Sequence, residues 1–188
     1  CTSATKFKVQ NITMASSAGT HLDAPIHCIP NGRTVANLTL EELCVPAFVI
    51  NVNQYTHAQY KFSVQDLKKF EQQYGIIKSG SLVIIHTGWS KHWSNPQQYH
   101  NNYHYPTVSL DAAQILIERN IVGLAIDTLS PDNDTDFSVH QLLLSNDKYL
   151  IENIANANLL PPTGYHIATL PLKIEGGSES PVRMIGFQ

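Results

Sequence analysis

Short runs of aliphatic and β-branched residues alternate with amphipathic segments along the chain, and they predict strands separated by helices. Three of these runs predict buried strands, and they cover residues 47–52, 82–86 and 122–126. Further strands are predicted over 165–174 and 182–187, which are joined through a Gly-Gly pair. A looser alternation over residues 6–14 predicts one more strand near the start of the chain.

Helical spacing and capping residues predict the helices that separate these strands. Ser63 is a suitable N-cap for a helix over 64–74, which Gly75 ends. The apolar positions of this helix, from Val64 to Tyr74, follow helical spacing, so we expect them to face the core. The other predicted helices are 38–43, capped by Asn37 or Thr39, 110–119, capped by Ser109, and 137–144.

The predicted fold class is α/β with a mixed or barrel-like sheet, because strands and helices mix without the strict alternation of βαβ units. The chain has 188 residues, enough for one substantial core, and contains no internal repeat or linker-like segment. We therefore predict a single domain over residues 1–188. For the polar stretch 91–104 we predict a mobile loop over the functional site, with histidines that are ordinary solvated surface groups.

Composition and charge argue against several classes of function. The net charge is −3 and 14 % of the residues are charged, without a basic run, so we expect no nucleic-acid partner. No apolar stretch is long enough to span a bilayer, so we expect no membrane partner. Cys1, Cys28 and Cys44 are odd in number and lack paired spacing, and we expect reduced, buried thiols rather than disulfides or a zinc knuckle.

The candidate chemistry is concentrated in residues 19–27, Gly-Thr-His-Leu-Asp-Ala-Pro-Ile-His. Pro25 removes a backbone donor and favours extended geometry before it, so this segment is not expected to be helical. Side chains alternate along an extended chain, which puts His21 and Asp23 on one face, with His27 as a further candidate for that face. A converging imidazole and carboxylate suit zinc or manganese, and a third group can act as a base.

This segment resembles the signature of the cyclase family of metal-dependent hydrolases, which includes bacterial kynurenine formamidase and isatin hydrolase. The signature reads His-x-Gly-Thr-His-x-Asp-x-Pro-x-His, and the chain matches every fixed position but the first, where it has Ser17. The resemblance continues through segments 79–89, 123–130, 140–144, 151–156, 170–173 and 180–183. The family's swivelling β/β/α architecture, as the resemblance implies it, agrees with the predicted fold class. Family members usually begin with another strand-rich segment, so we expect an N-terminal segment to be missing here.

The resemblance implies five metal-ligand positions and one acid/base. The implied ligands are Ser17, His21, Asp23, His140 and Glu152, and the implied acid/base is His27. A carboxylate such as Asp23 can bridge two cations, so the implied cofactor is Zn²⁺ or Mn²⁺, one or two per chain. The metal would lower the pKa of a water and polarise the scissile carbonyl, while His27 would move the protons.

Ser17 is the main departure from the family pattern, because a neutral hydroxyl is a far weaker zinc ligand than an imidazole. Three outcomes are open: a single metal, a weaker second site completed by water, or altered or lost activity. We favour a hydrolase with one tightly held metal.

Three further residues are candidates for the substrate pocket, namely Trp89, Asp127 and Ser130. Trp89 is equally suited to wall an aromatic substrate or to pack in the core. Asp127 ends a predicted strand and is equally suited to form a turn. The acidic stretch 132–136 superficially resembles a calcium loop, but it lacks the glycine and distal glutamate of that loop, so we reject a calcium site.

We therefore expect a metal-dependent amidohydrolase that cleaves the C–N bond of a small-molecule amide or formamide. The resemblance implies an arylformamidase that acts on N-formylkynurenine in tryptophan catabolism, with cyclic amides such as isatin, or lactones, as alternative substrates. A catalytically degenerate protein that binds a metal or ligand is the alternative from another class. The resemblance also implies a homo-oligomer, dimer or tetramer. We expect a cytoplasmic protein, or a periplasmic or secreted one if Cys1 is a processed terminus.

Overall fold

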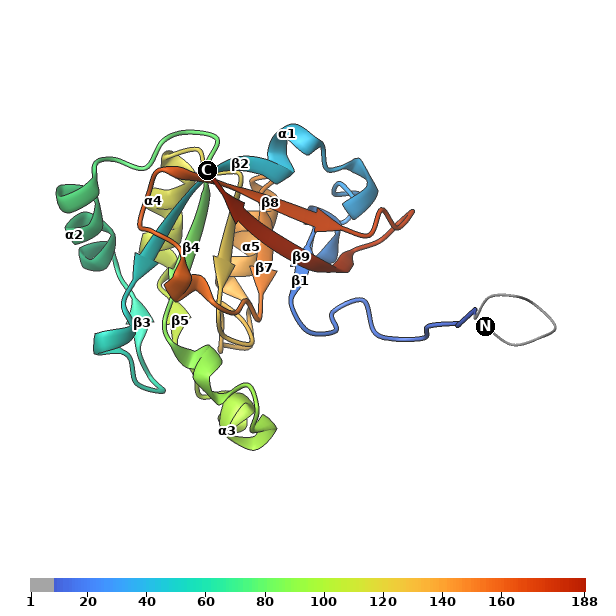
Figure 1. The fold of residues 1–188 in the computed structure, drawn as a ribbon, viewed down its shortest axis with the longest axis horizontal. Coiled ribbons are helices and arrows are strands. Elements are labelled where there is room, and N and C mark those ends of the chain that lie inside the picture. Colours follow the sequence, from blue (N-terminus) through green and yellow to red (C-terminus); the bar gives the residue numbers. More distant parts are fainter. Residues whose placement is uncertain (1–8) are drawn as a thin grey trace.

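The strands of the described residues close into a mixed β-barrel (Figure 1). The structure is a computed structural model and describes residues 9–188. The order around the barrel is β1-β7-β6-β4-β2-β8-β9, and β9 pairs with β1 to close it. These strands are β1 (His21–Asp23), β2 (Cys44–Asn51), β4 (Leu82–His86), β6 (Gly123–Ile126), β7 (Tyr149–Glu152), β8 (Tyr165–Pro171) and β9 (Glu179–Phe187). The predicted α/β class with a barrel-like sheet is confirmed.

The barrel has a parallel part and an antiparallel part. Strands β2, β4, β6 and β7 pair in parallel, and helical crossovers connect neighbouring strands of this part. Strands β1, β8 and β9 join the barrel through antiparallel pairs. Because β1 is paired on both of its edges, by β7 and by β9, its three side chains are held at fixed positions relative to both neighbours.

Three helices pack against one face of the parallel strands, and they are α2 (Val64–Tyr74), α4 (Leu110–Glu118) and α5 (Ser138–Ser145). The alternation of strand side chains decides which core each residue joins. In β4, Val83 and Ile85 pack in one apolar cluster with residues of the three helices, while Leu82 and Ile84 pack in a second cluster with residues of the other strands. Each parallel strand therefore turns one face toward the helices. Polar side chains on that face lie between the strand and the helices.

The remaining elements are short. The helices are α1 (Leu40–Leu43) and α3 (Pro96–His100), the 3₁₀ turns are η1 (Pro25–His27), η2 (Val35–Asn37), η3 (Asn53–Tyr55), η4 (Trp89–His92), η5 (Asn101–Tyr103) and η6 (Ala157–Leu159), and the parallel pair outside the barrel is β3 (Lys61–Phe62) with β5 (Thr107–Val108). Within the described part of the chain, no helix is long and apolar enough to cross a membrane.

The predicted caps occur where the sequence placed them. The Ser63 side chain accepts a hydrogen bond from the backbone N–H of Asp66, and α2 spans the predicted residues 64–74. Ser109 accepts from the N–H of Ala112 at the start of α4. These bonds satisfy N–H groups that have no partner inside the helix, which is why the helices begin at these residues.

Four expectations were wrong. Residues 9–14 form no strand, and Val9 and Ile12 are 76 % and 81 % exposed, because this segment has no neighbouring strand with which to pair; residues 6–8 of that prediction lie outside the described residues. Tyr74 is exposed, since it lies at the last position of α2, beyond the core.

The third correction concerns the cysteines, which were expected to be buried. Cys44 is a free but exposed thiol, and Cys28 is free and partly buried. Cys1 lies outside the described residues.

The fourth correction concerns the stretch 91–104, for which a loop was expected, whereas it contains the end of η4, all of α3 and all of η5. Asn95 caps α3 by accepting a hydrogen bond from the N–H of Gln98, and Pro96 occupies the first helical position. Tyr99 is buried and anchors this excursion to the barrel, below which α3 projects in Figure 1. The polar composition of the stretch hid this single apolar anchor.

Candidate metal centre

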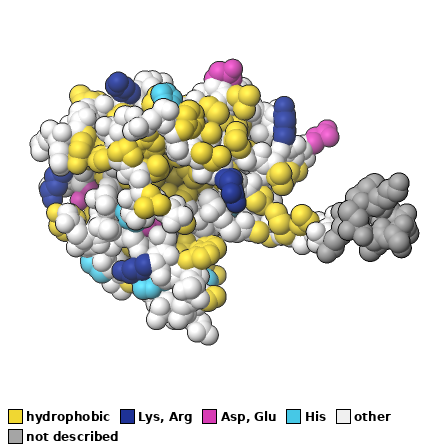
Figure 2. Space-filling model, viewed as in Figure 1, with side chains coloured by type: hydrophobic (Ala, Val, Ile, Leu, Met, Phe, Trp, Pro, Cys, Tyr) yellow, Lys and Arg dark blue, Asp and Glu magenta, His cyan; other side chains and the backbone are white. Residues whose placement is uncertain are grey.

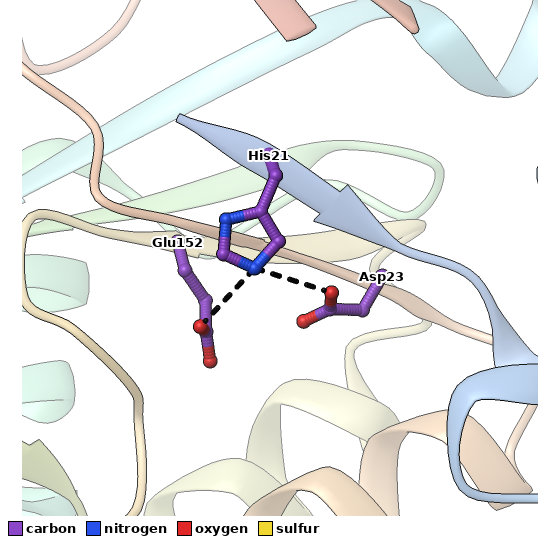
Figure 3. A group of neighbouring side chains, drawn as sticks. All are labelled: His21, Asp23 and Glu152. Carbon is purple, nitrogen blue, oxygen red and sulfur yellow. Dashed lines mark ion pairs between the residues drawn. The ribbon is translucent and has the colours of Figure 1, made fainter. Parts of the chain in front are cut away.

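Strand β1 presents two of the predicted metal ligands on one face of the barrel wall. Leu22 is buried in the strand-lined cluster, so its neighbours His21 and Asp23 project from the opposite face (Figure 3). His21 Nε2 lies 3.4 Å from Asp23 Oδ1. The extended geometry expected from Pro25 therefore brings these two side chains together.

Glu152 reaches this pair through the register of the barrel. Strand β1 runs antiparallel to β7 with His21 opposite Glu152, the last residue of β7. His21 Nε2 lies 3.4 Å from Glu152 Oε2. A dashed line marks this ion pair in Figure 3. The ligand atoms of His21, Asp23 and Glu152 all lie within 4.8 Å of one another.

His140 approaches the same two carboxylates from α5. Its Nε2 lies 3.1 Å from Glu152 Oε1 and 3.8 Å from Asp23 Oδ2. Each carboxylate is therefore shared between two imidazoles, one from the barrel wall and one from the helix that packs on it.

Asp132 holds His140 in place, and the sequence analysis missed this role. Asp132 accepts hydrogen bonds from the backbone N–H groups of Val139 (2.9 Å) and His140 (3.0 Å), and His140 Nδ1 donates to Asp132 Oδ2 at 2.7 Å. Phe137 occupies the N-cap position of α5 but makes no side-chain capping bond. Asp132, which lies in the preceding loop, caps the helix instead. A carboxylate on Nδ1 fixes the orientation of the ring and turns Nε2 toward the position of a metal ion.

The four side chains of the cluster, His21, Asp23, His140 and Glu152, shift one another's pKa values. Burial alone would lower the pKa of His21, but contact with Glu152 and the charge of Asp23 raise it to about 9. Burial would also lower the pKa of His140, but its hydrogen bonds with Asp132 and Glu152 raise that pKa to about 10. Burial and the charge of Glu152 raise the pKa of Asp23 to about 7. Although burial acts against it, hydrogen bonds from His140 and His21 keep the pKa of Glu152 below its ordinary value.

The cluster fits a divalent metal ion. Asp23 Oδ1 and Glu152 Oε1 are buried, and within the described residues they have no polar partner apart from the neighbouring imidazoles of His21 and His140. A cation between these oxygens would offset the cost of burying two carboxylates. Imidazole nitrogen and carboxylate oxygen are ligands that zinc and manganese accept. In the metal-free cluster, protons on the imidazoles supply the positive charge that a cation would bring.

His27 lies beside the cluster and differs from its neighbours in exposure. Its side chain is 32 % exposed, and its ring centroid is 6.1 Å from that of His140. Partial burial and the nearby His140 lower the pKa of His27, although Glu179 acts in the opposite sense. His27 is therefore a neutral imidazole near neutral pH, the state that a general base requires.

Glu179 is a second functional candidate that the sequence analysis missed. Strand β9 pairs with β1 so that Glu179 lies opposite Asp23, and Glu179 Oε1 is 3.8 Å from His27 Nδ1. Ser16 Oγ donates to Glu179 Oε2 at 2.9 Å. Nothing in the local sequence of Glu179 marks it, because only barrel closure brings β9 to the signature.

Ser17 and the cluster border a common cavity of about 250 Å³, which is also lined by His27, Asn153 and Glu179. The predicted ligand at the signature's first position thus lies at the rim of the site. A second cavity, of about 720 Å³, opens beside it and is lined by His27, His140 and Glu152 together with the aromatic residues Tyr103, Tyr105 and Phe137.

The three predicted pocket residues have different positions. Ser130 lines the 720 Å³ cavity. Asp127 is fully buried and accepts hydrogen bonds from the N–H and Oγ1 of Thr87, so it ties two strand ends together. Trp89 is buried against Tyr99, whose carbonyl accepts a hydrogen bond from the indole N–H at 2.8 Å. Their contacts favour a turn-forming role for Asp127 and a packing role for Trp89.

Comparisons with known proteins point to one family. The family model described as putative cyclase matches residues 2–133, more than half of the chain. The chain is 28 % identical to isatin hydrolase from Roseibium aggregatum, over 94 % of this chain and 73 % of that protein. It is 26 % identical to kynurenine formamidase from Salinibacter ruber, over 93 % of this chain and 77 % of that protein.

Solved structures agree with the sequence comparisons. Isatin hydrolase A from Labrenzia aggregata, bound to benzyl benzoate, matches with a TM-score of 0.88 and 30 % identity, over 96 % of this chain and 76 % of that one. A structure described as a potential metal-dependent hydrolase with cyclase activity matches with a TM-score of 0.77 and 25 % identity, over 93 % and 80 % of the two chains.

Proposed function

The chain belongs to the cyclase family and is a metal-dependent hydrolase, and we propose that it cleaves the C–N bond of a small aryl formamide or amide. The observation that carries this proposal is the buried cluster in which the imidazoles of His21 and His140 converge on the carboxylates of Asp23 and Glu152. Such a set needs a cation, and a cation in an open cavity beside a neutral histidine supports hydrolytic chemistry.

We assign the metal to His21, Asp23, His140 and Glu152, with Ser17 at the rim as a weak fifth group. One tightly held Zn²⁺ or Mn²⁺ is the proposed content, because the hydroxyl of Ser17 supplies no strong ligand for a second ion. When bound, such an ion polarises a carbonyl group and lowers the pKa of a water toward neutrality.

His27 is the proposed acid/base. Its Nδ1 faces Glu179, which leaves Nε2 to exchange protons in the cavity. Nε2 takes a proton from the water as its oxygen bonds to the carbonyl carbon, and His27 then delivers a proton to the leaving nitrogen as the C–N bond breaks. Asp132 keeps His140 oriented throughout, so the cluster need not reorganise during the reaction.

The larger cavity supports an aromatic substrate. Its volume of about 720 Å³ and its lining by Tyr103, Tyr105 and Phe137 suit a ring attached to the scissile amide. N-formylkynurenine is the proposed formamide, in line with the kynurenine formamidase relatives. The 30 % identity to isatin hydrolase A favours a cyclic amide such as isatin as the second candidate.

The test combines metal analysis with a substrate panel. Protein purified without chelator is analysed for metal, stripped, reloaded with Zn²⁺ or Mn²⁺, and assayed with N-formylkynurenine, isatin and an aryl lactone. We expect about one ion per chain and hydrolysis that disappears on stripping and returns on reloading. A protein that binds metal but hydrolyses none of the three would support the degenerate alternative, and a protein that binds no metal would overturn the proposal.

We also propose that the protein is a homo-oligomer. Hydrophobic side chains gather on the face shown in Figure 2. In β8 and β9, Leu170, Ile185 and Phe187 are 46–48 % exposed. Apolar residues exposed side by side on a sheet face are typical of an interface between subunits. Light scattering during size exclusion tests this proposal, and a monomer at micromolar concentration would contradict it.

A further inference from the structure

We propose that Asn153 donates a hydrogen bond from its side-chain Nδ2 to the carbonyl oxygen of the substrate, and that Tyr99 orients the Asn153 amide for this purpose. The inference deepens the proposed function and rests on it. It concerns a residue next to the metal cluster that has no place in the predicted ligand set.

Asn153 lies at the edge of the site. It follows Glu152 directly at the end of β7 and lines the 250 Å³ cavity together with His21 and His27. It also lines a neighbouring cavity of about 320 Å³, which is bordered by Ser17 and Trp93. The Asn153 side chain therefore borders the space in which a substrate would meet the cluster.

The backbone of Asn153 is fixed from both sides. Its N–H donates to the carbonyl of Thr128 at 3.0 Å, and its carbonyl accepts from Thr20 Oγ1 at 2.6 Å. Its φ of 57° is left-handed, a conformation that asparagine tolerates better than most residues. Thr20 of the signature therefore helps to fix the residue that follows Glu152.

The side-chain oxygen of Asn153 is also occupied. The Tyr99 hydroxyl lies 2.8 Å from Asn153 Oδ1 and 3.2 Å from the carbonyl of Asp127. Tyr99 has one hydroxyl proton, and the shorter contact assigns it to Oδ1. Within residues 9–188, no hydrogen bond is formed by Asn153 Nδ2, so its two N–H donors remain free at the cavity.

A free amide donor suits the developing charge of amide hydrolysis. When water adds to a carbonyl carbon, negative charge grows on the carbonyl oxygen, and a fixed N–H group stabilises it without reorganising. Because backbone and Oδ1 are held before substrate arrives, Asn153 Nδ2 is preorganised. Tyr99 acts through Asn153 and is a positioning residue.

Asn153→Gly tests the donor with little backbone strain, because glycine adopts a left-handed φ readily. The matched control is Asn156→Gly, since Asn156 also has a left-handed φ, of 61°, but is exposed three residues further along. For metal-loaded Asn153→Gly we expect kcat to fall about 100-fold, with KM changed less than about threefold and metal content unchanged. Tyr99→Phe should lower kcat less, about tenfold, and Asn156→Gly should not change it.

Formate binding to the metal-loaded protein separates this inference from the proposed function, because it needs no turnover. We expect the Kd for formate, measured by calorimetry, to rise about tenfold in Asn153→Gly and to stay constant in Asn156→Gly. A wild type that hydrolyses none of the amides overturns the proposed function, but weaker formate binding by Asn153→Gly still supports the donor. An active wild type whose kcat and formate affinity survive Asn153→Gly overturns the donor alone. Loss of metal from Asn153→Gly would also overturn it, since Asn153 would then act on the cluster rather than on the substrate.

Discussion

His21 lies opposite Glu152 in the antiparallel pairing of β1 with β7, and His21 Nε2 is 3.4 Å from Glu152 Oε2. The barrel register, rather than a flexible loop, therefore sets the distance between two of the proposed metal ligands. Residues placed on paired strands are held more accurately than residues on loops, so the cluster is formed before a metal arrives.

Replacing Glu152 should remove the metal. Glu152→Gln keeps the shape of the side chain but loses the charge that both imidazoles face, and we expect metal content after dialysis to fall below about a tenth of the wild-type value. Glu41→Gln, on the exposed side of α1, is the matched control and should retain its metal. Elemental analysis of the two variants side by side gives the answer, and equal metal in both would rule out Glu152 as a ligand.

Asp132→Asn should weaken metal binding without abolishing it. With its single acceptor oxygen in the Oδ2 position, asparagine can still accept hydrogen bonds from the His140 N–H and Nδ1, but without the charge of the carboxylate. The bond from the Val139 N–H is lost. Groups in this position typically change metal affinity 10–100-fold, so we expect a rise in Kd within that range. Competition with a chromophoric chelator measures it, and the helix content by circular dichroism should remain unchanged. An unaltered Kd would mean that Asp132 only caps the helix.

His27→Ala should separate chemistry from metal binding. We expect kcat to fall about 10²–10⁴-fold while the metal content stays at the wild-type level, because His27 moves protons and is not among the assigned ligands. His104→Ala, on the exposed end of the α3 excursion, serves as a control histidine. If His27→Ala lost its metal, His27 would have to be reassigned as a ligand together with Asp23 and Glu179, whose ligand atoms lie within 4.8 Å of one another and of His27.

Ser17→His should strengthen metal binding. The substitution supplies an imidazole at the rim of the 250 Å³ cavity, where the family signature has one, and we expect the metal content to rise from about one toward two ions per chain. Ser16→His, one residue earlier, is the matched control, since that side chain bonds to Glu179 instead. Unchanged metal content and affinity in Ser17→His would show that this position no longer serves the cluster.

The stability of the metal-free protein should decrease as pH rises from 7 to 10. The pKa of His21 is raised to about 9 and that of His140 to about 10, both from 6.5, so their protonation stabilises the folded state. That contribution is complete below pH 6.5 and is lost as pH passes through 9 and 10. We expect Tm to fall by at least about 3 °C over this range. Metal-loaded protein, whose imidazoles carry no such proton on Nε2, should show a smaller fall, and parallel curves would contradict the assignment.

Local sequence determined the elements that depend on neighbouring residues. The α2 helix from Val64 to Tyr74 followed from its Ser63 cap and terminal Gly75, because capping and helical spacing act within a few residues. The common face of His21 and Asp23 followed from strand alternation and the adjacent proline. Resemblance to the family then supplied the later ligand candidates, His140 and Glu152.

Tertiary structure decided everything that depends on strand pairing and barrel closure. Glu179 meets His27 only because β9 pairs with β1, and Asp132 reaches His140 only because a loop folds back onto the start of α5. The side-chain amide of Asn153 is held by the hydroxyl of Tyr99, which lies 54 residues earlier. Tyr99 belongs to a segment for which the sequence predicted a polar loop. Residue types and local spacing carry no record of which distant segments pair, because register is set by the packing of the whole barrel. The sequence therefore determined which residues have metal chemistry, and the fold alone decided which neighbours orient them.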